Sequence, residues 1–127
     1  MYAEWLNDEQ KYKQLVNDTR IQTEKNWDRW RWDKILDLLE GNLITQSRLE
    51  LLYKSKFIKR LLKFYLPDKQ QFIALPWNKE NLIYAKCGYL LIKRLVHDKH
   101  GRRILSSEDE LVQFLGIPFY EQHDQLF

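Results

Sequence analysis

The 127 residues suffice for one domain with a buried core, and 44% hydrophobic with 31% charged residues exclude a disordered or a membrane-embedded chain. Four glycines and three prolines are too few for a many-stranded sandwich or barrel, and a single cysteine excludes an intramolecular disulfide. The net charge is only +3, but its distribution along the chain is informative.

The first two elements are expected to be helices of different character. Residues 4–25 are polar with sparse apolar positions, which predicts a weakly amphipathic helix. A second helix is expected from Trp27 to Glu40, and Gly41 marks its end. Its apolar residues recur at i, i+3, i+4 and i+7, on one helical face: Trp32, Ile35, Leu36 and Leu39.

Two shorter segments follow. The capping-box spacing of Ser47 and Glu50 predicts the start of a short helix. A further helix is expected to end before Pro67. Its stripe consists of Ile58, Leu61, Leu62 and Tyr65, broadened by Phe57 and Phe64. The apolar connector 67–77, which contains Phe72 and Trp77, is expected to be pinned to the core.

The longest helix is predicted from Asn78, as its cap, to about Val96. Gly88 lies in its middle, where a neighbouring helix is expected to approach closely. The pair His100-Gly101 is expected to interrupt the helical pattern. A second capping box at Ser107-x-x-Glu110 predicts a last helix that closes at Gly116.

These elements predict an all-α fold, either a helical-repeat (α-solenoid-like) arrangement or a compact multi-helix domain. We expect a polar helical arm over residues 1–26, a helical domain over 27–116 and a C-terminal tail over 117–127. The chain lacks both a signal-peptide pattern and the roughly 20-residue apolar run of a membrane span, so a cytoplasmic location is expected.

No pattern in the chain predicts catalysis. Cys87 falls on the apolar stripe of a helix, where the expectation is a small buried hydrophobe. His97 and His100 have loose metal-like spacing but no further ligands, so a surface pair is expected. An enzyme built on Cys87 or His97 is the alternative. We therefore expect no catalytic residues, no metal and no cofactor.

The charge of the chain is concentrated in its centre. Residues 51–105 contain thirteen basic and three acidic residues, a net of +10, whereas residues 1–50 have a net charge of −2 and residues 106–127 of −5. Such a centre could be a solvated face, could meet an acidic segment of the chain, or could bind an acidic partner. The densest stretch comprises Lys54, Lys56, Lys59, Arg60 and Lys63. Its aromatic neighbours are expected in the core rather than stacked on bases.

A resemblance extends from about Trp30 to Leu115. The strongest part is Phe57-Ile58-Lys59-Arg60-Leu61-Leu62-x-Phe64-Tyr65-x-Pro67, accompanied by Trp30-x-Trp32, Gly41-x-Leu43, Leu75-x-Trp77, Cys87-Gly88 and Gly101-Arg102. These residues resemble the helical region of the Rictor family, subunits of TOR complex 2, in the style of its fungal members. This region is likened to the N-terminal segment of Ras exchange factors, which implies no exchange activity.

The resemblance implies a non-catalytic scaffold segment that acts through protein–protein contact. The partners it implies are TOR kinase and a Sin1-like subunit, with possible contact to an anionic membrane at the cell periphery. The residues expected to bind partners are Trp27, Trp30, Lys56, Lys59, Arg60 and Lys63. The alternative is a small basic helical protein that binds nucleic acid or anionic phospholipid.

Overall fold

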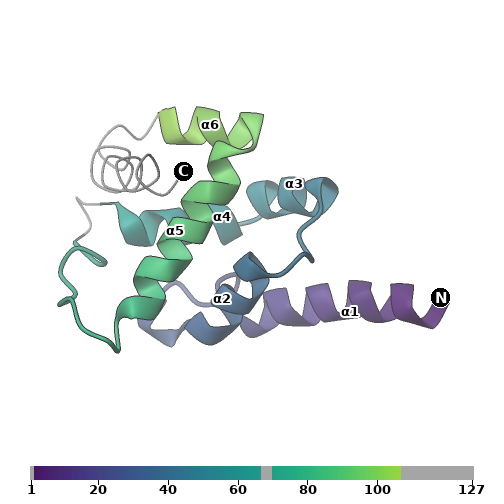
Figure 1. Cartoon of the computed structure of the whole chain (residues 1–127), viewed down its shortest axis with the longest axis horizontal. Helices are drawn as coiled ribbons and strands as arrows, with labels where there is room; N and C mark the ends of the chain where they lie inside the picture. The colour runs from purple at the N-terminus through teal and green to yellow at the C-terminus, as the bar shows by residue number, and fades with distance from the viewer. Residues whose placement is uncertain (1, 67–69, 107–127) are drawn as a thin grey trace. The chain divides into compact units, whose positions relative to one another are not determined.

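The computed structural model describes residues 2–66 and 70–106, with side chains from residue 8 onward. Over this part of the chain the structure is helical and contains no strand, which confirms the all-α fold class (Figure 1). The elements are α1 (Tyr2–Asp18), η1 (Trp27–Arg29), α2 (Trp32–Glu40), α3 (Gln46–Lys54), α4 (Phe57–Tyr65), α5 (Leu82–Val96) and α6 (Lys99–Ser106).

The chain forms two compact units, residues 1–63 and 64–127. The predicted division into an arm, a helical domain and a tail stays a prediction. The capping box at Ser107-x-x-Glu110 and the tail 117–127 lie outside the described residues.

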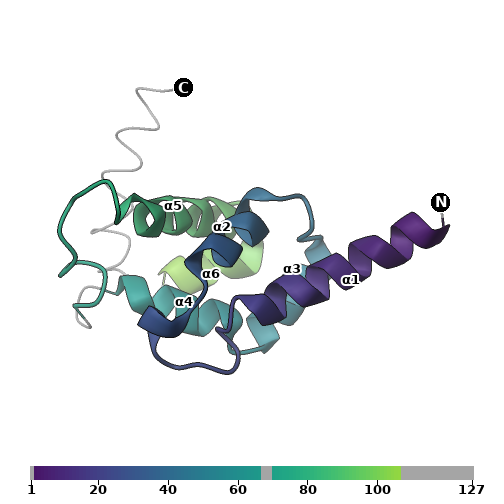
Figure 2. The same cartoon turned by 90° about the horizontal axis from the view of Figure 1, so that it is seen from below.

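In the first unit, α1 and α2 pack against each other (Figure 2). The helix expected over residues 4–25 is shorter than predicted and ends at Asp18. The hydroxyl of the buried Thr19 donates to the Val16 carbonyl oxygen at 2.6 Å, and Arg20 adopts a positive φ of 67°. This left-handed residue turns the chain out of the helix, a local change that hydrophobic spacing does not reveal.

The tryptophan-rich segment does not form the continuous helix that was expected from Trp27. It begins as the 3-10 turn η1 and restarts at Trp32 as α2. The Trp32 indole Nε1 donates to the Trp27 carbonyl oxygen at 2.9 Å, so the break is supported by a side chain. The buried face of α2 includes Leu38, while Leu36 is only half-buried.

The boundaries of α2, α3 and α4 follow the sequence signals with one shift. Gly41 follows the last residue of α2, as predicted. Thr45, rather than Ser47, caps α3, and its hydroxyl accepts from the Arg48 N–H at 3.3 Å. α4 was predicted correctly, and its apolar residues, namely Phe57, Ile58, Leu61, Leu62, Phe64 and Tyr65, are buried.

An aromatic cluster lies at the centre of the second unit. Its members are Phe64, Tyr65, Phe72 and Tyr84, with ring centroids 4.9–6.0 Å apart. The Phe72 N–H donates to the Phe64 carbonyl oxygen at 3.3 Å, so the connector is pinned at Phe72 as predicted. Edge-to-face and tilted arrangements of this kind suit the quadrupoles of the rings.

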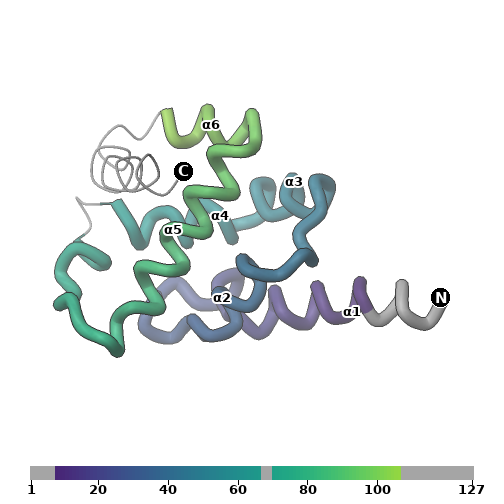
Figure 3. Tube along the Cα trace, in the orientation of Figure 1, coloured from purple at the N-terminus to yellow at the C-terminus, as the bar shows by residue number. Residues whose placement is uncertain are grey.

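α5 and α6 pack against each other and meet at a tight turn after Val96 (Figure 3). α5 begins at Leu82, with Asn81 rather than Asn78 as its cap residue. A Cβ atom added at Gly88 would lie only 2.7 Å from the Tyr65 ring, which confirms the predicted close approach. Gly101 does not interrupt a helix as expected but lies within α6, where its missing Cβ leaves room for the Leu95 backbone.

Candidate functional site

The surface of α4 carries a row of lysines, Lys56, Lys59 and Lys63, which we call the lysine face. All three side chains are exposed. At about 100° per residue they share an arc of about 60° on the helix. Lys56 precedes Phe57 but continues the helical path, because its carbonyl oxygen accepts from the Arg60 N–H at 3.0 Å. The structure therefore brings these three sequence-predicted residues together.

The three lysines of this face and the neighbouring Arg60 differ in their contacts. Lys56, Lys59 and Lys63 form no ion pair or hydrogen bond with the side chains of residues 8–63. Arg60 is half-buried, and its Nη1 donates to the Ile21 carbonyl oxygen at 2.7 Å. Arg60 thus supports the irregular turn after α1, while the three lysines face solvent.

The electrostatics of the lysine face oppose helix formation. Lys59 and Lys63 stand at i and i+4, where like charges cost a few tenths of a kcal/mol (about 0.2–0.5). The first turn of α4 contains no acidic residue, although acids are favoured there by the helix dipole. The buried apolar face, which includes Leu61 at 0% exposure, supplies the stabilisation instead.

The two tryptophans predicted to bind partners have different environments. Trp30 is buried at 5% exposure, and its indole Nε1 donates to the Glu24 carbonyl oxygen at 2.6 Å. Its ring lies 5.7 Å from that of Trp32. Trp27 is half-buried, and its carbonyl oxygen accepts from Trp32. A role for these two residues in binding stays a prediction, and Trp30 also stabilises the core of its unit.

Two charged residues beside the tryptophans form an ion pair. Arg31 and Asp33 form an exposed ion pair at the start of α2, with Nη2 and Oδ2 3.1 Å apart. The hydrogen bond from Arg31 lowers the pKa of the Asp33 carboxyl below its ordinary value. An exposed pair of this kind contributes little to stability.

The most exposed large hydrophobic residue in the described chain is Trp77, at 83%. The expectation that the connector is pinned to the core is wrong for Trp77. The loop around it is ordered by hydrogen bonds of 2.9 Å from Asn81 Nδ2 to the Pro76 carbonyl oxygen and from the Asn81 N–H to Asn78 Oδ1. The signal in the sequence was the Pro76-Trp77-Asn78 run, which places an aromatic ring between two turn-forming residues.

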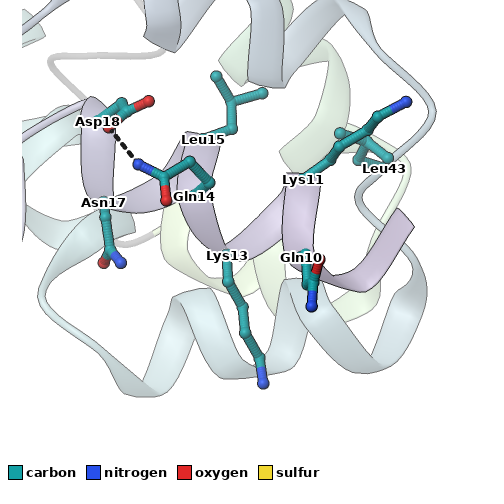
Figure 4. Close-up of a pocket in the computed structure, with 8 residues that line it drawn as sticks. All are labelled: Gln10, Lys11, Lys13, Gln14, Leu15, Asn17, Asp18 and Leu43. Atoms are coloured by element: carbon teal, nitrogen blue, oxygen red, sulfur yellow. Dashed lines mark hydrogen bonds between the residues drawn. The ribbon is translucent and has the colours of Figure 1, made fainter. Parts of the chain in front are cut away.

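An open groove of about 730 Å³ lies along α1 (Figure 4). Its lining comprises Gln10, Lys11, Lys13, Gln14, Leu15, Asn17, Asp18 and Leu43. Gln14 Nε2 donates to Asp18 Oδ1 at 2.9 Å, and Lys13 points away from Leu15 (Figure 4). The polar groups therefore do not converge on one point, and none of the sequence-predicted residues lines this groove.

The residues considered for catalysis do not line this groove. Cys87 is fully buried, as predicted for a small hydrophobe, and His97 and His100 are exposed. Within the described ranges, no three His, Cys, Asp or Glu side chains are grouped so that they could hold a metal ion. In the same ranges, every helix is too short or too polar to cross a membrane.

Three curated proteins are similar to the chain along most of its length. Protein pianissimo A of Dictyostelium discoideum is 32% identical over 117 residues, which is 92% of the chain. The target of rapamycin complex 2 subunit ste20 of Schizosaccharomyces pombe is 31% identical over 107 residues, 84% of the chain. The target of rapamycin complex 2 subunit TSC11 of Saccharomyces cerevisiae is 34% identical over 111 residues, 86% of the chain.

The chain belongs to the Rictor family. This confirms the resemblance seen in the Phe57–Pro67 run. The Rictor-family chain spans only 8–10% of the length of these relatives, so it corresponds to one segment of them. No protein-family model and no solved structure matches it.

Proposed function

We propose that this Rictor-family chain is a non-catalytic helical scaffold segment of a TOR complex 2 subunit and acts through protein–protein contact. The observation that carries the proposal is the similarity to two proteins named as TOR complex 2 subunits, across 84% and 86% of the chain. The proposed partners are TOR kinase and a Sin1-like subunit, and the proposed location is the cytoplasm, with peripheral contact at the plasma membrane.

Two surface features support a role in protein contact. Trp77 presents an aromatic ring at 83% exposure on an ordered loop, and tryptophan is a favoured anchor in protein interfaces. The lysine face adds a charged surface that can select an acidic partner. A scaffold of this kind would position its partners by the rigidity of its helices and would need no cofactor.

The experiment is a co-precipitation from cells that express the tagged chain of 127 residues, followed by mass spectrometry. Recovery of TOR kinase or a Sin1-like subunit with the wild-type chain, and its loss with Trp77→Ala, is the expected result. Leu51→Ala is the matched control, because Leu51 is also an exposed hydrophobic residue, at 62%. Neither substitution removes a buried side chain, so a loss of binding is not explained by unfolding.

Two results would count against the scaffold function. One is recovery of nucleic acid or lipid without any TOR complex 2 component, which favours the basic-protein alternative. The other is enzymatic turnover that depends on Cys87, a residue that is fully buried in the structure. A thiol reagent applied to the folded chain measures whether the Cys87 sulfur is accessible. If the chain is a scaffold, Cys87 is expected to be unreactive.

A further inference from the structure

The exposed part of α4 is cationic throughout. Within Phe57–Tyr65, the residues that are not buried are Lys59, Arg60 and Lys63. Surface helices gain stability when opposite charges stand at i and i+4, yet Lys56 and Arg60 repeat the like-charge pairing of Lys59 and Lys63. Helix formation does not account for Lys56 and Lys59, since a glutamate at either position would favour the start of the helix and attract Arg60 or Lys63.

The spacing of the lysine face matches one helical stripe. Lys56 and Lys63 are seven residues apart, which places them about 10 Å apart along the helix axis, with Lys59 between them. A second helix with carboxylates at i, i+3 or i+4, and i+7 has the same period. Laid beside α4, it would pair each of the three ammonium groups with a carboxylate.

Other anionic partners fit the surroundings of these lysines less well. Phe57, Phe64 and Tyr65 are buried at 0–1% exposure, so α4 offers no aromatic ring on which a base could stack. The apolar face of α4 is occupied in the core, so the helix cannot insert it into a bilayer. Lysine ammonium groups act as mobile point charges rather than the planar forks that grip single phosphates, which suits a row of separate carboxylates.

We propose that the lysine face binds an acidic helix of a partner protein, with Asp or Glu at i, i+3 or i+4, and i+7. This inference rests on the proposed function, because it assumes that the segment acts through protein contact. It adds the chemical class of the partner and the three residues that recognise it. Arg60 stands at the edge of the face and serves mainly to hold the turn at Ile21.

The test measures binding of the full chain to a synthetic alanine-rich helix of about 20 residues that carries glutamates along one stripe. Fluorescence anisotropy gives the dissociation constant. A peptide of identical composition, with its glutamates spread around the helix, tests the spacing. The expected result is tighter binding of the striped peptide and an affinity that falls as NaCl is raised.

Charge reversal at Lys59→Glu with Lys63→Glu is expected to weaken binding at least about tenfold. The control is Lys11→Glu with Lys13→Glu, which changes the net charge equally at two exposed positions of α1 and should leave affinity within about twofold. The reversed variant is expected to bind a striped lysine peptide instead. Equal weakening by both double variants, or equal binding of both glutamate peptides, would overturn the proposal in favour of general charge attraction.

Two further measurements separate the remaining outcomes. Vesicles with phosphatidylserine and a single-stranded DNA of about 20 nucleotides are offered to the same chain, and tighter binding of either than of the striped peptide overturns the proposal. The melting temperature of the single Lys59→Glu variant should rise by about 1–3 °C, because the repulsion between positions 59 and 63 becomes an attraction. A fall would mean that these lysines serve folding, which contradicts the premise.

The co-precipitation described above distinguishes this inference from the scaffold function. If TOR kinase is recovered with both the wild-type chain and the lysine-reversed variant, the scaffold function stands and the lysine face is not its contact. If the striped peptide binds but no TOR complex 2 component is recovered, the lysine face is an acidic-helix site in a protein with another role.

Discussion

Residues 8–63 hold their irregular segments mainly with side-chain N–H donors, whereas the described residues from Phe64 onward combine such donors, at Asn81 and Arg102, with close packing of aromatic rings and glycines. In the first unit, the donors of Trp30, Arg48 and Arg60 reach backbone carbonyl oxygens at Glu24, Leu43 and Ile21. In the second, Tyr65 packs against Phe72 at 5.0 Å between ring centroids.

The difference follows from the connections in each unit. The first unit contains non-helical segments around residues 19–31 and 41–45, whose carbonyl groups need donors from elsewhere. The second also contains the irregular connector 70–81, but Phe72 of this connector packs among aromatic rings, and the 15-residue helix α5 satisfies most of its own backbone groups. We therefore expect the first unit to be sensitive to lost donors and the second to added volume.

Trp30→Ala is expected to have the largest effect, a loss of about 3–5 kcal/mol in the free energy of unfolding. It removes a buried indole and leaves the Glu24 carbonyl oxygen without its donor. Trp30→Phe separates the two causes, since it keeps much of the volume but not the N–H. Urea denaturation measures both, and a Trp30→Phe variant as stable as the wild type would break the comparison.

Gly88→Ala is expected to destabilise the chain by about 1–3 kcal/mol, although alanine favours helices. The added Cβ would stand 2.7 Å from the Tyr65 ring. That ring cannot easily move, because its hydroxyl donates to the Tyr84 carbonyl oxygen at 2.5 Å. Gly41→Ala is the matched control: its nearest atom is 3.1 Å away, and a loss below about 1 kcal/mol is expected by thermal denaturation.

Arg48→Met is expected to cost about 1–2 kcal/mol. Arg48 links α3 to α1 and to the connector before α3: it pairs with Glu9 at 2.5 Å and lies 4.8 Å from the centroid of the Tyr12 ring, and it donates to the Leu43 carbonyl oxygen at 2.6 Å. A double-mutant cycle with Glu9→Gln isolates the ion pair. A coupling energy that equals the entire loss would show that the hydrogen bond to the Leu43 carbonyl oxygen contributes nothing, which would contradict the dependence of the first unit on such donors.

Tyr65→Phe is expected to cost about 1 kcal/mol near neutral pH through loss of the hydrogen bond to Tyr84. Burial raises the pKa of the Tyr65 phenol well above its ordinary value of 10.0. An unfolded tyrosine ionises near pH 10 while the folded one stays protonated, so unfolding releases a proton and stability falls as pH rises above 10. Denaturation between pH 8 and about 11 should show a shallower fall for Tyr65→Phe; parallel curves would assign the alkaline loss to other groups.

Much of the helical content and of the lysine face was predictable. The spacing of Ile58, Leu61 and Leu62 predicted α4 with its buried face, and the remaining positions had to carry the lysines outward. The Rictor-family assignment was also reached from the residues of this helix and its neighbours.

The predictions that were wrong concern single residues at helix starts and in one connector. Thr45 instead of Ser47 caps α3, and Asn81 instead of Asn78 precedes α5. Several residues near each start have a side chain that can cap, and only the packed backbone selects one of them. Trp77 illustrates the same limit, because an apolar residue in a connector can be buried or exposed according to the path of the loop.

The sequence by itself determined the helices, the segregation of charge in α4 and the family, because these depend on residue type and on local spacing. Tertiary structure alone decided that Trp30 is a core residue, that Arg60 holds the turn at Ile21 and that Trp77 is exposed. These outcomes depend on which distant carbonyl oxygen or ring lies within a few ångströms of each side chain, and periodicity contains no information about such distances.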